Sequence, residues 1–221
     1  FSDLGRVYWL KVWEVPQGSR NSRGKPIVNM FPLQPGEKVN VVLPLTDGFR
    51  SFPADHYVMM ATAGGQIKKT PLDEFSNPRK AGIIALTLGD GDYLVGAALT
   101  DGKHDVMLFS DGGKAVRFDE ADVPSYGRTA GGVRGMKRDP AQSVIAMLVA
   151  EDETQSVLTA TENGFGKRTS ILEYTRHGRG TKGMIAIQQT ERNGKVVAAA
   201  LVTKDDEVML ISTGGVLIRT K

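Results

Sequence analysis

The chain has 221 residues, of which 28 are basic and 25 acidic, so its formal net charge is only +3, and 40% of the residues are hydrophobic. This length allows one large or two ordinary domains, and the apolar content is enough for a substantial core. The absence of cysteine excludes disulfides, thiolate zinc sites and cysteine nucleophiles. No apolar run approaches the roughly 18 residues of a membrane-spanning helix, and the first residues lack the layout of a signal peptide.

The most regular feature of the sequence is a pair of glycines that recurs along the chain. The first glycine of each pair lies in a predicted hairpin turn, and the second follows 17 or 19 residues later in a basic loop. The hairpin glycines are Gly5, Gly65, Gly113, Gly164 and Gly215, and the loop glycines are Gly24, Gly82, Gly132 and Gly183. Successive hairpin glycines are 60, 48, 51 and 51 residues apart, and a polar insertion at 46–56 accounts for the longest spacing. Repetition at this period indicates an array of small β units.

Four short strands are predicted in each unit from runs of apolar and β-branched residues. The first strands are predicted at 57–60, 105–108, 156–159 and 207–210, and the second strands at 6–12, 66–70, 114–118, 165–169 and 216–220. The third strands are predicted at 26–30, 83–88, 133–137 and 184–188, and the fourth strands at 39–45, 93–99, 144–149 and 196–202. No segment has a convincing helical pattern.

The strand count and the period predict an all-β fold, a propeller-like ring of four-stranded blades within a single domain. The repeat units are expected at about 1–45, 57–100, 105–150, 156–202 and 207–221. They provide four near-complete blades and parts of two more. Because the chain begins inside one unit and stops inside another, we expect it to be a fragment of a larger ring.

Basic residues are concentrated around the loop glycines. The windows 15–36, 75–89, 124–138 and 174–190 together carry twelve basic residues and no acidic residue, whereas the rest of the chain has 16 basic and 25 acidic residues. In a ring these loops would occupy equivalent positions and form a track that gains affinity for a phosphate backbone by counterion release. The alternative is that they are ordinary solvated loops. The candidate DNA-binding residues are Arg20, Arg23, Lys25, Arg79, Lys80, Arg128, Arg134, Lys137, Arg176, Arg179 and Lys182.

Other signals in the sequence are weaker. Residues 178–183 satisfy GxGxxG, but a dinucleotide-binding motif should open a helix, and a strand is predicted after this one. Trp9 and Trp13 are expected to pack within a blade rather than to stack on bases. No catalytic or metal-binding motif is evident. Basic residues also recur on the second strands, where they could either protect an exposed sheet edge or contact DNA; they are Lys68, Lys69, Arg117, Lys167, Arg168 and Arg219.

Several segments resemble the C-terminal domain of bacterial DNA gyrase A. The segments that carry the resemblance are Gly5–Val12 (GRVYWLKV), Ser22–Asn29 (SRGKPIVN), Gly131–Met136 (GGVRGM) and Asn163–Thr169 (NGFGKRT). The resemblance extends over essentially the whole chain. One departure is that the family's hallmark heptapeptide, QRRGGKG, is absent, and RHGRGTKG at Arg176–Gly183 is a degenerate relative in a different unit.

The resemblance implies a β-pinwheel, in which neighbouring blades exchange a strand, and a domain that wraps double-stranded DNA around its outer rim. By the same resemblance, the domain is a non-catalytic part of a cytoplasmic, nucleoid-associated type II topoisomerase and has no cofactor or metal of its own. The implied partners are the rest of gyrase A, together with gyrase B, in a heterotetramer, with ATP and Mg²⁺ used elsewhere and no membrane contact. Alternative readings are the corresponding DNA-binding domain of topoisomerase IV, a protein-interaction scaffold, and a propeller enzyme with a site in its central channel.

Overall fold

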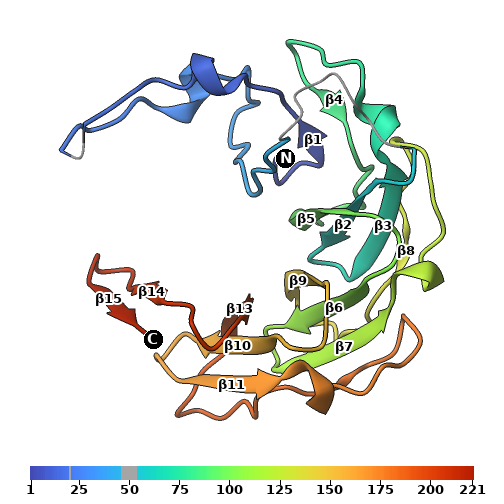
Figure 1. Cartoon of the computed structure of the whole chain (residues 1–221), viewed down its shortest axis with the longest axis vertical. Coiled ribbons are helices and arrows are strands. Elements are labelled where there is room, and N and C mark those ends of the chain that lie inside the picture. Colours follow the sequence, from blue (N-terminus) through green and yellow to red (C-terminus); the bar gives the residue numbers. More distant parts are fainter. Residues whose placement is uncertain (20, 46–53) are drawn as a thin grey trace.

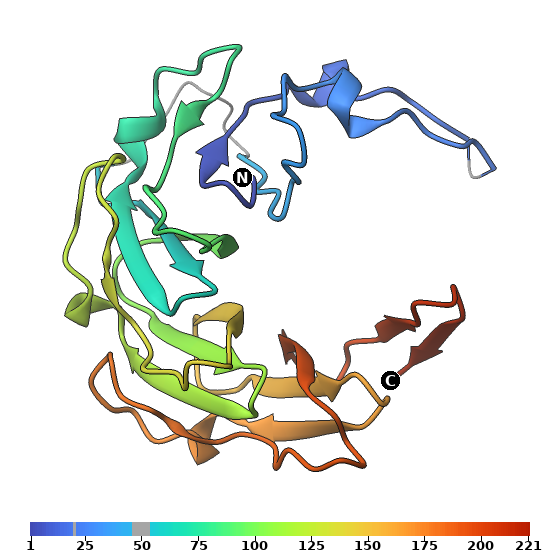
Figure 2. The same ribbon diagram turned by 180° about the vertical axis from the view of Figure 1, so that it is seen from behind.

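The computed structural model describes residues 1–19, 21–45 and 54–221. The predicted site residue Arg20 and positions 46–53 of the predicted insertion lie outside these ranges. Within the described residues, the regular elements are β-strands and short 3-10 helices, and none is an α-helix. Small sheets follow one another around an open arc, which Figures 1 and 2 show from opposite sides. The all-β prediction is therefore confirmed.

Each central unit begins with an antiparallel hairpin, to which a later strand of the same unit adds on the inner side. The hairpins are β2 (Tyr57–Thr62) with β3 (Gln66–Pro71), β6 (Asp105–Ser110) with β7 (Lys114–Asp119), and β10 (Ser156–Thr161) with β11 (Gly166–Ser170). The added strands are β5 (Leu94–Thr100), β9 (Val144–Ala150) and β13 (Val196–Val202). Near the C-terminus, β14 (Val208–Ile211) pairs with β15 (Leu217–Thr220). These strands were predicted within one or two residues at most ends.

In the two four-stranded sheets of the described residues, one edge strand comes from the next unit along the chain. Three two-residue strands make this exchange: β4 (Ile83–Ile84) pairs with β1 (Arg6–Val7), β8 (Val133–Arg134) with β3, and β12 (Met184–Ile185) with β7. The exchange distinguishes a β-pinwheel from an ordinary propeller. These strands are shorter than predicted because the chain turns after two residues. In the first case the amides of Ala85 and Leu86 both donate to the carbonyl of Gly5, at 2.9 and 3.1 Å.

Six of the nine hairpin and loop glycines lie where neighbouring units approach closely: Gly5, Gly65, Gly82, Gly113, Gly132 and Gly183. All nine have positive φ, a conformation in which a side chain is strained. A Cβ on Gly113 would lie 2.2 Å from the carbonyl oxygen of Ile187, and a Cβ on Gly183 would lie 2.2 Å from that of Ala115. Both partners belong to the neighbouring unit. The repeated glycine pair is therefore the sequence signature of the strand exchange.

The hydrophobic core lies between successive blades rather than at the centre of the arc. One cluster joins Met59 and Ile67 of one blade to Val106, Leu108 and Phe118 of the next, and all five side chains are buried. Strands β5, β9 and β13 line the inner side of the arc, and β8 lies toward its outer side (Figure 1). Each blade is thus stabilised by burial against its neighbours.

The first unit departs most from the prediction. Residues 26–30, predicted as a strand, contain the 3-10 helix η2 (Ile27–Asn29), and residues 39–45 form only an isolated bridge between Val39 and Ser2. The other fourth strands pair along a first strand of six residues, whereas here the amides of Asn40 and Val41 both donate to the carbonyl of Phe1, at 3.0 and 3.2 Å. Trp13, expected to be packed, is 79% exposed on an extended arm, while Trp9 packs against the core.

Candidate nucleic-acid interface

The acid-free windows contain loops that follow a 3-10 helix; in the three central units the loop leads to the exchanged strand, and in the first unit it leads to η2. The helices are η1 (Val12–Glu14), η4 (Leu72–Phe75), η5 (Glu120–Asp122) and η6 (Ile171–Glu173). We call the connecting segments 15–26, 76–82, 123–132 and 174–183 the rim loops. The last three lie along the outer side of the arc, and the described residues of the first, 15–19 and 21–26, belong to the arm (Figures 1 and 2). The sequence-based expectation of equivalent outer positions therefore fits the geometry of the central units.

Hydrogen bonds join each of the last two rim loops to the segment that follows the preceding rim loop, beginning with the exchanged strand. Arg128 lies four residues before its loop glycine, and its Nη1 donates to the carbonyl of Ile84 at 2.9 Å. Arg179, at the equivalent position of the next loop, donates through Nη1 to the carbonyl of Arg134 at 3.1 Å. The amide of Gly180 adds a bond to the carbonyl of Gly135 at 2.6 Å. Three loops from three units therefore form one continuous ridge along residues 76–87, 123–137 and 174–183.

A buried lysine fixes the middle rim loop from below. Lys68 on β3 has no exposed surface, and its ammonium donates to the carbonyls of Ala85, Arg128 and Ala130, the first and last at 2.9 and 3.0 Å. Burial, together with the positive charge of Arg128, lowers the pKa of Lys68 to about 8. The ammonium thus connects the backbone of two units beneath the ridge.

The basic residues that recur on the second strands are buried wherever another unit packs over the strand, so at those positions they are not exposed charges at a sheet edge. Lys69 is 8% and Arg117 6% exposed. Each donates to the first carbonyl of the next unit's 3-10 helix, Lys69 to Glu120 at 3.1 Å and Arg117 to Ile171 at 3.0 Å. Both expectations, edge protection and DNA contact, are wrong for Lys68, Lys69 and Arg117, because these side chains hold blades together. On β11 the equivalent Arg168 is exposed.

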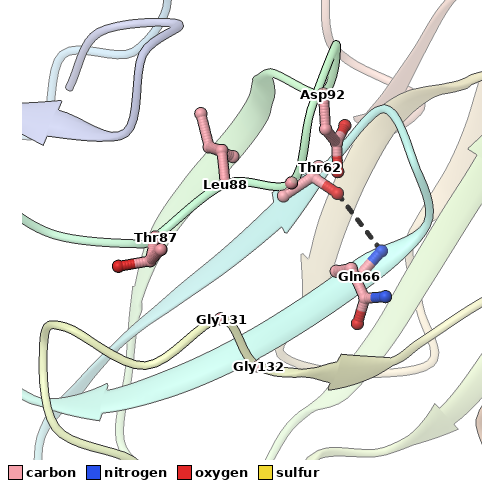
Figure 3. A pocket seen from close by; sticks show the side chains of 8 residues that line it. Thr62, Gln66, Thr87, Leu88, Asp92, Gly131 and Gly132 are labelled. Atoms are coloured by element: carbon pink, nitrogen blue, oxygen red, sulfur yellow. Dashed lines mark hydrogen bonds between the residues drawn. The ribbon is translucent and has the colours of Figure 1, made fainter.

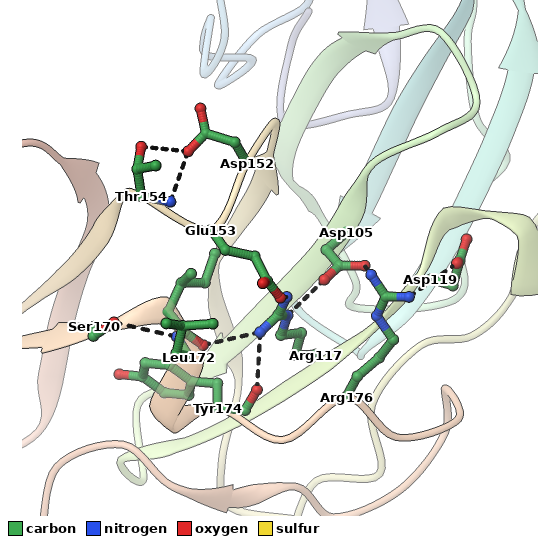
Figure 4. Close-up of polar contacts among 11 residues, drawn as sticks. Asp105, Arg117, Asp119, Asp152, Glu153, Thr154, Ser170, Leu172, Tyr174 and Arg176 are labelled. Carbon is green, nitrogen blue, oxygen red and sulfur yellow. Dashed lines mark hydrogen bonds and ion pairs between the residues drawn. The ribbon is translucent and has the colours of Figure 1, made fainter.

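Arg117 is the centre of a buried ionic network (Figure 4). Its Nε contacts Asp105 at 2.6 Å, its Nη2 contacts Glu153 at 2.8 Å, and its Nη1 also donates to the carbonyl of Tyr174 at 3.2 Å. Burial lowers the pKa of Arg117, but its hydrogen bonds to Glu153 and Asp105 outweigh that effect and raise the pKa. The predicted site residue Arg176 joins this network through Asp105 at 2.6 Å, so much of its charge is already compensated.

The predicted DNA-binding residues therefore fall into groups with different surroundings. One group consists of exposed side chains without a hydrogen bond or ion pair to another described residue: Arg23, Lys25, Arg79, Lys80, Arg134 and Lys137. A second group faces carboxylates: Arg128 with Glu74 at 3.8 Å, Lys182 with Asp139 at 3.4 Å, and Arg176 with Asp105 and Asp119. Arg179 donates to backbone carbonyls of Asp122 and Arg134. The first group is the best placed to neutralise phosphates.

The structure also shows which side chains sequence reasoning missed. Arg6, directly after the first hairpin glycine, lies beside the rim loop of the next unit and donates to the carbonyl of Ala81 at 2.7 Å. Lys68 was noticed in the sequence but misread. The repeat could have identified Arg6, because Arg6 directly follows a hairpin glycine. The strand after each such glycine runs under the rim loop of the next unit.

A hollow of about 260 Å³ lies beside the ridge (Figure 3). Its lining includes Thr62, Gln66, Thr87 and Asp92 but no basic side chain. Asp92 accepts a hydrogen bond from the amide of Gly64 at 2.6 Å and so fixes the hairpin turn. This hollow therefore lacks the charge that an anion would require.

Other classes of site find little support in the described part of the chain. No group of three or more histidine, cysteine, aspartate or glutamate side chains there could hold a metal ion. None of the helices in those residues is long and apolar enough to cross a membrane.

Comparisons with known proteins agree with this architecture. A family model described as "DNA gyrase C-terminal domain, beta-propeller" matches residues 1–45, 56–101, 104–151, 155–203 and 206–221. Over its whole length the chain is 50% identical to the DNA gyrase A protein of Klebsiella oxytoca and 46% identical to that of Escherichia coli strain K12. In both cases the chain spans 25% of the relative.

Two solved structures have a similar fold. The C-terminal domain of DNA gyrase A matches with a TM-score of 0.82 and 26% identity, over 99% of this chain and 69% of that one. The C-terminal domain of DNA topoisomerase IV matches with a TM-score of 0.89 and 23% identity, over 100% of this chain and 68% of that one. At that identity the second match supports the fold alone, whereas the sequence relatives point to gyrase A.

Proposed function

Because the chain belongs to the DNA gyrase C-terminal domain family, we propose that it binds duplex DNA along the ridge of rim loops and bends the duplex around the arc. The observation that carries the proposal is the continuity of the ridge. On the outer side of the arc, the rim loops 123–132 and 174–183 are each hydrogen-bonded to the exchanged strand of the preceding unit, and exposed cations such as Arg79, Lys80, Arg134 and Lys137 lie along the ridge.

The chemistry of this interface is phosphate neutralisation. Arginine and lysine side chains release condensed counterions when they contact phosphates, and such contacts carry no direct sequence information. The arc offers no helix that could enter a major groove, since its described helices are 3-10 turns of three or four residues. We therefore expect binding with little sequence preference and a strong dependence on salt.

Bending requires contacts that are spread along the duplex. Because DNA is stiff over about 150 base pairs, bending a site of 20–30 base pairs by 40–90° costs about 1–6 kcal/mol. Single cations on consecutive units can offset that cost together, provided that the units keep a fixed spacing. The hydrogen bonds of Arg128 and Arg179 help to keep that spacing, since each anchors its rim loop to the exchanged strand of the preceding unit.

In the longer protein, we propose that this bending sets the direction of supercoiling. Wrapping with a fixed hand would present a second segment of the same DNA to a cleavage site in the rest of gyrase A, in the sense that gives negative supercoils. The chain would then be an accessory domain of a cytoplasmic, nucleoid-associated enzyme with gyrase B as a further partner. ATP and Mg²⁺ would act outside this domain.

Two measurements test the proposal. Circular DNA relaxed and resealed with the domain bound should show a shift in linking number after the protein is removed. In the second measurement, fluorescence anisotropy follows the binding of random-sequence duplex DNA over a series of salt concentrations. The slope of log binding constant against log salt concentration should be less steep by about 1.8 in the variant Lys80→Gln/Arg134→Gln than in wild type, because each lost phosphate contact removes about 0.9. Both residues are exposed and lie on neighbouring parts of the ridge.

The matched control removes the same charge from turns outside the rim loops. Lys103 and Arg192 are exposed and follow β5 and β12, respectively. The control Lys103→Gln/Arg192→Gln should keep the wild-type slope. An unchanged linking number, or equal slopes for the rim variant and the control, would refute rim binding.

A further inference from the structure

Three arginines from three successive units meet in one notch on the ridge. The notch has a volume of about 260 Å³, and its lining includes Arg6 from β1, Arg79 from the rim loop 76–82, and Arg128 from the rim loop 123–132. Gly82 and Thr129 complete much of the wall, and no acidic residue is part of the lining. These arginines are distant in sequence, so the notch exists only because the units exchange strands.

Each arginine keeps donors available for an additional acceptor. Arg6 and Arg128 are each held by one carbonyl, that of Ala81 at 2.7 Å and that of Ile84 at 2.9 Å, respectively. These bonds use Nη2 of Arg6 and Nη1 of Arg128, so each arginine keeps the N–H groups of its other Nη atom. The Nε groups of both are buried and have no hydrogen-bond partner among the described residues. A buried donor without an acceptor is costly, and a guanidinium has five N–H groups. Arg79 is exposed and makes no side-chain hydrogen bond with another described residue.

The backbone brings the loops close enough to share one ligand. Gly82 has φ +71°, and a Cβ there would lie 2.6 Å from the ring of Tyr8, so the rim loop packs directly on the first unit. The compensating charge at the notch is limited. Glu74 lies 3.8 Å from Nε of Arg128, and its carboxylate is about half exposed to solvent, where screening weakens the attraction.

We propose that this notch binds a single phosphate group of the DNA backbone and fixes the register of the duplex on the ridge. The inference rests on the proposed function and deepens it, because it separates one built phosphate site from the diffuse contacts elsewhere on the rim. Guanidinium groups match the geometry of phosphate oxygens through paired N–H donors. Three of them converging on one hollow favour an oxyanion over a neutral ligand.

The next junction along the ridge provides a natural comparison. At the positions equivalent to Arg6 and Arg79, relative to the hairpin and loop glycines, it has the neutral residues Gln66 and Thr129. It retains an arginine, Arg179, at the position of Arg128, and Arg134 stands where the first junction has Ile84. The two junctions therefore differ in the number and placement of their charges although their backbones are equivalent.

This comparison defines a variant that should fold. Arg6→Gln/Arg79→Thr introduces side chains that the same fold already accepts at Gln66 and Thr129. The charge-matched control is again Lys103→Gln/Arg192→Gln. Far-UV circular dichroism and thermal unfolding of both variants verify that they are folded before binding is compared.

The first measurement uses no DNA. Inorganic phosphate is titrated into the protein, and the Nε–Hε signals of Arg6, Arg79 and Arg128 are followed by ¹⁵N NMR. We expect saturable shifts of these three signals in the wild-type protein and loss of the Arg128 response in Arg6→Gln/Arg79→Thr. Shifts that do not saturate, or that are equal for all exposed arginines, would overturn the built site.

The second measurement uses random duplex DNA. We expect the variant to lose roughly tenfold in affinity for each lost contact at 0.1 M salt and to flatten the salt slope by about 0.9–1.8. Wild-type binding with an unchanged slope in the variant would overturn the notch while leaving the proposed function intact. Absence of DNA binding by the wild-type protein would overturn both.

Discussion

Replacing Arg117 with methionine should destabilise the domain far more than the same change at Arg168. The two arginines occupy the same position, four residues after a hairpin glycine. Arg117 is 6% exposed beneath the next unit, whereas Arg168 is exposed on β11. Methionine keeps the length and most of the apolar stem of the side chain, so the comparison isolates the guanidinium.

The contacts of Arg117 set the magnitude. Removing the guanidinium deprives the carbonyl of Tyr174 of its donor at 3.2 Å, which costs about 1–3 kcal/mol for a buried group. Buried Asp105 loses one of its two cationic partners but keeps Arg176 at 2.6 Å. Glu153 is exposed, so the loss of its ion pair with Arg117 contributes less than about 1 kcal/mol. The expected total is about 3–5 kcal/mol, the range for breaking a buried ion pair.

The assay is urea unfolding monitored by far-UV circular dichroism, with Arg168→Met as the control. The control should remain within about 0.5 kcal/mol of wild type, as for most surface substitutions. If Arg117→Met lies within about 1 kcal/mol of Arg168→Met, the network does not stabilise the contact between blades, and the reasoning from its geometry is refuted.

Three further predictions concern the ridge and its glycines. Lys68→Met should accelerate amide exchange in the rim loop 123–132 but not in 174–183, because only the former loses the ammonium; equal effects in hydrogen-exchange mass spectrometry would contradict this. The lowered pKa of Lys68, about 8, means that below pH 8 both the folded and the unfolded chain carry the proton, whereas between about pH 8 and 10.5 the unfolded chain holds it more tightly. The free energy of unfolding of wild type relative to Lys68→Met should therefore rise with pH in that interval, by at most about 1.4 kcal/mol per unit, and urea titrations at pH 7.5 and 9.5 that give the same difference would contradict the assignment. Gly132→Ala should cost about 2–4 kcal/mol, because φ is +87° and the new Cβ would lie 2.5 Å from the carbonyl oxygen of Ile67. Gly164→Ala, with φ +81° and open space around it, should cost only about 1 kcal/mol, and equal melting temperatures for the two variants would exclude a packing role for the loop glycine.

Much of the fold could be predicted from the sequence because the repeat leaves a local signature. Gly65 and Gly113 lie in tight turns between strands that are buried along most of their length, and such turns require little information from elsewhere in the chain. The exchange of β4, β8 and β12 could not be read in the same way. A two-residue strand has no periodicity of its own, and its partner lies in another unit. Residues 39–45 were wrongly predicted as a strand, because an apolar run does not show which segment it pairs with.

The candidate site was predicted at the level of charge but not of individual contacts. The acid-free windows led to the rim loops, because a bias in composition can be counted without knowing the fold. Which cations remain available depends on distant partners. Arg128 reaches Ile84 across 44 residues and Arg179 reaches Asp122 across 57, and neither separation has a local signal. Lys68 was misread because the sequence does not show whether a strand at the edge of its own unit is covered by another.

Strand exchange also determines where this domain can be divided. The repeat boundary after Ala150 looks like a natural place to end a shorter version of the chain. A chain ending there would lose β12, which completes the sheet that contains β6, β7 and β9. The carbonyl of Gly113 would also lose the amides of Ala186 and Ile187. A shorter chain that keeps this sheet and these hydrogen bonds would have to continue through Ile187. The smallest complete structural unit therefore spans parts of two sequence repeats.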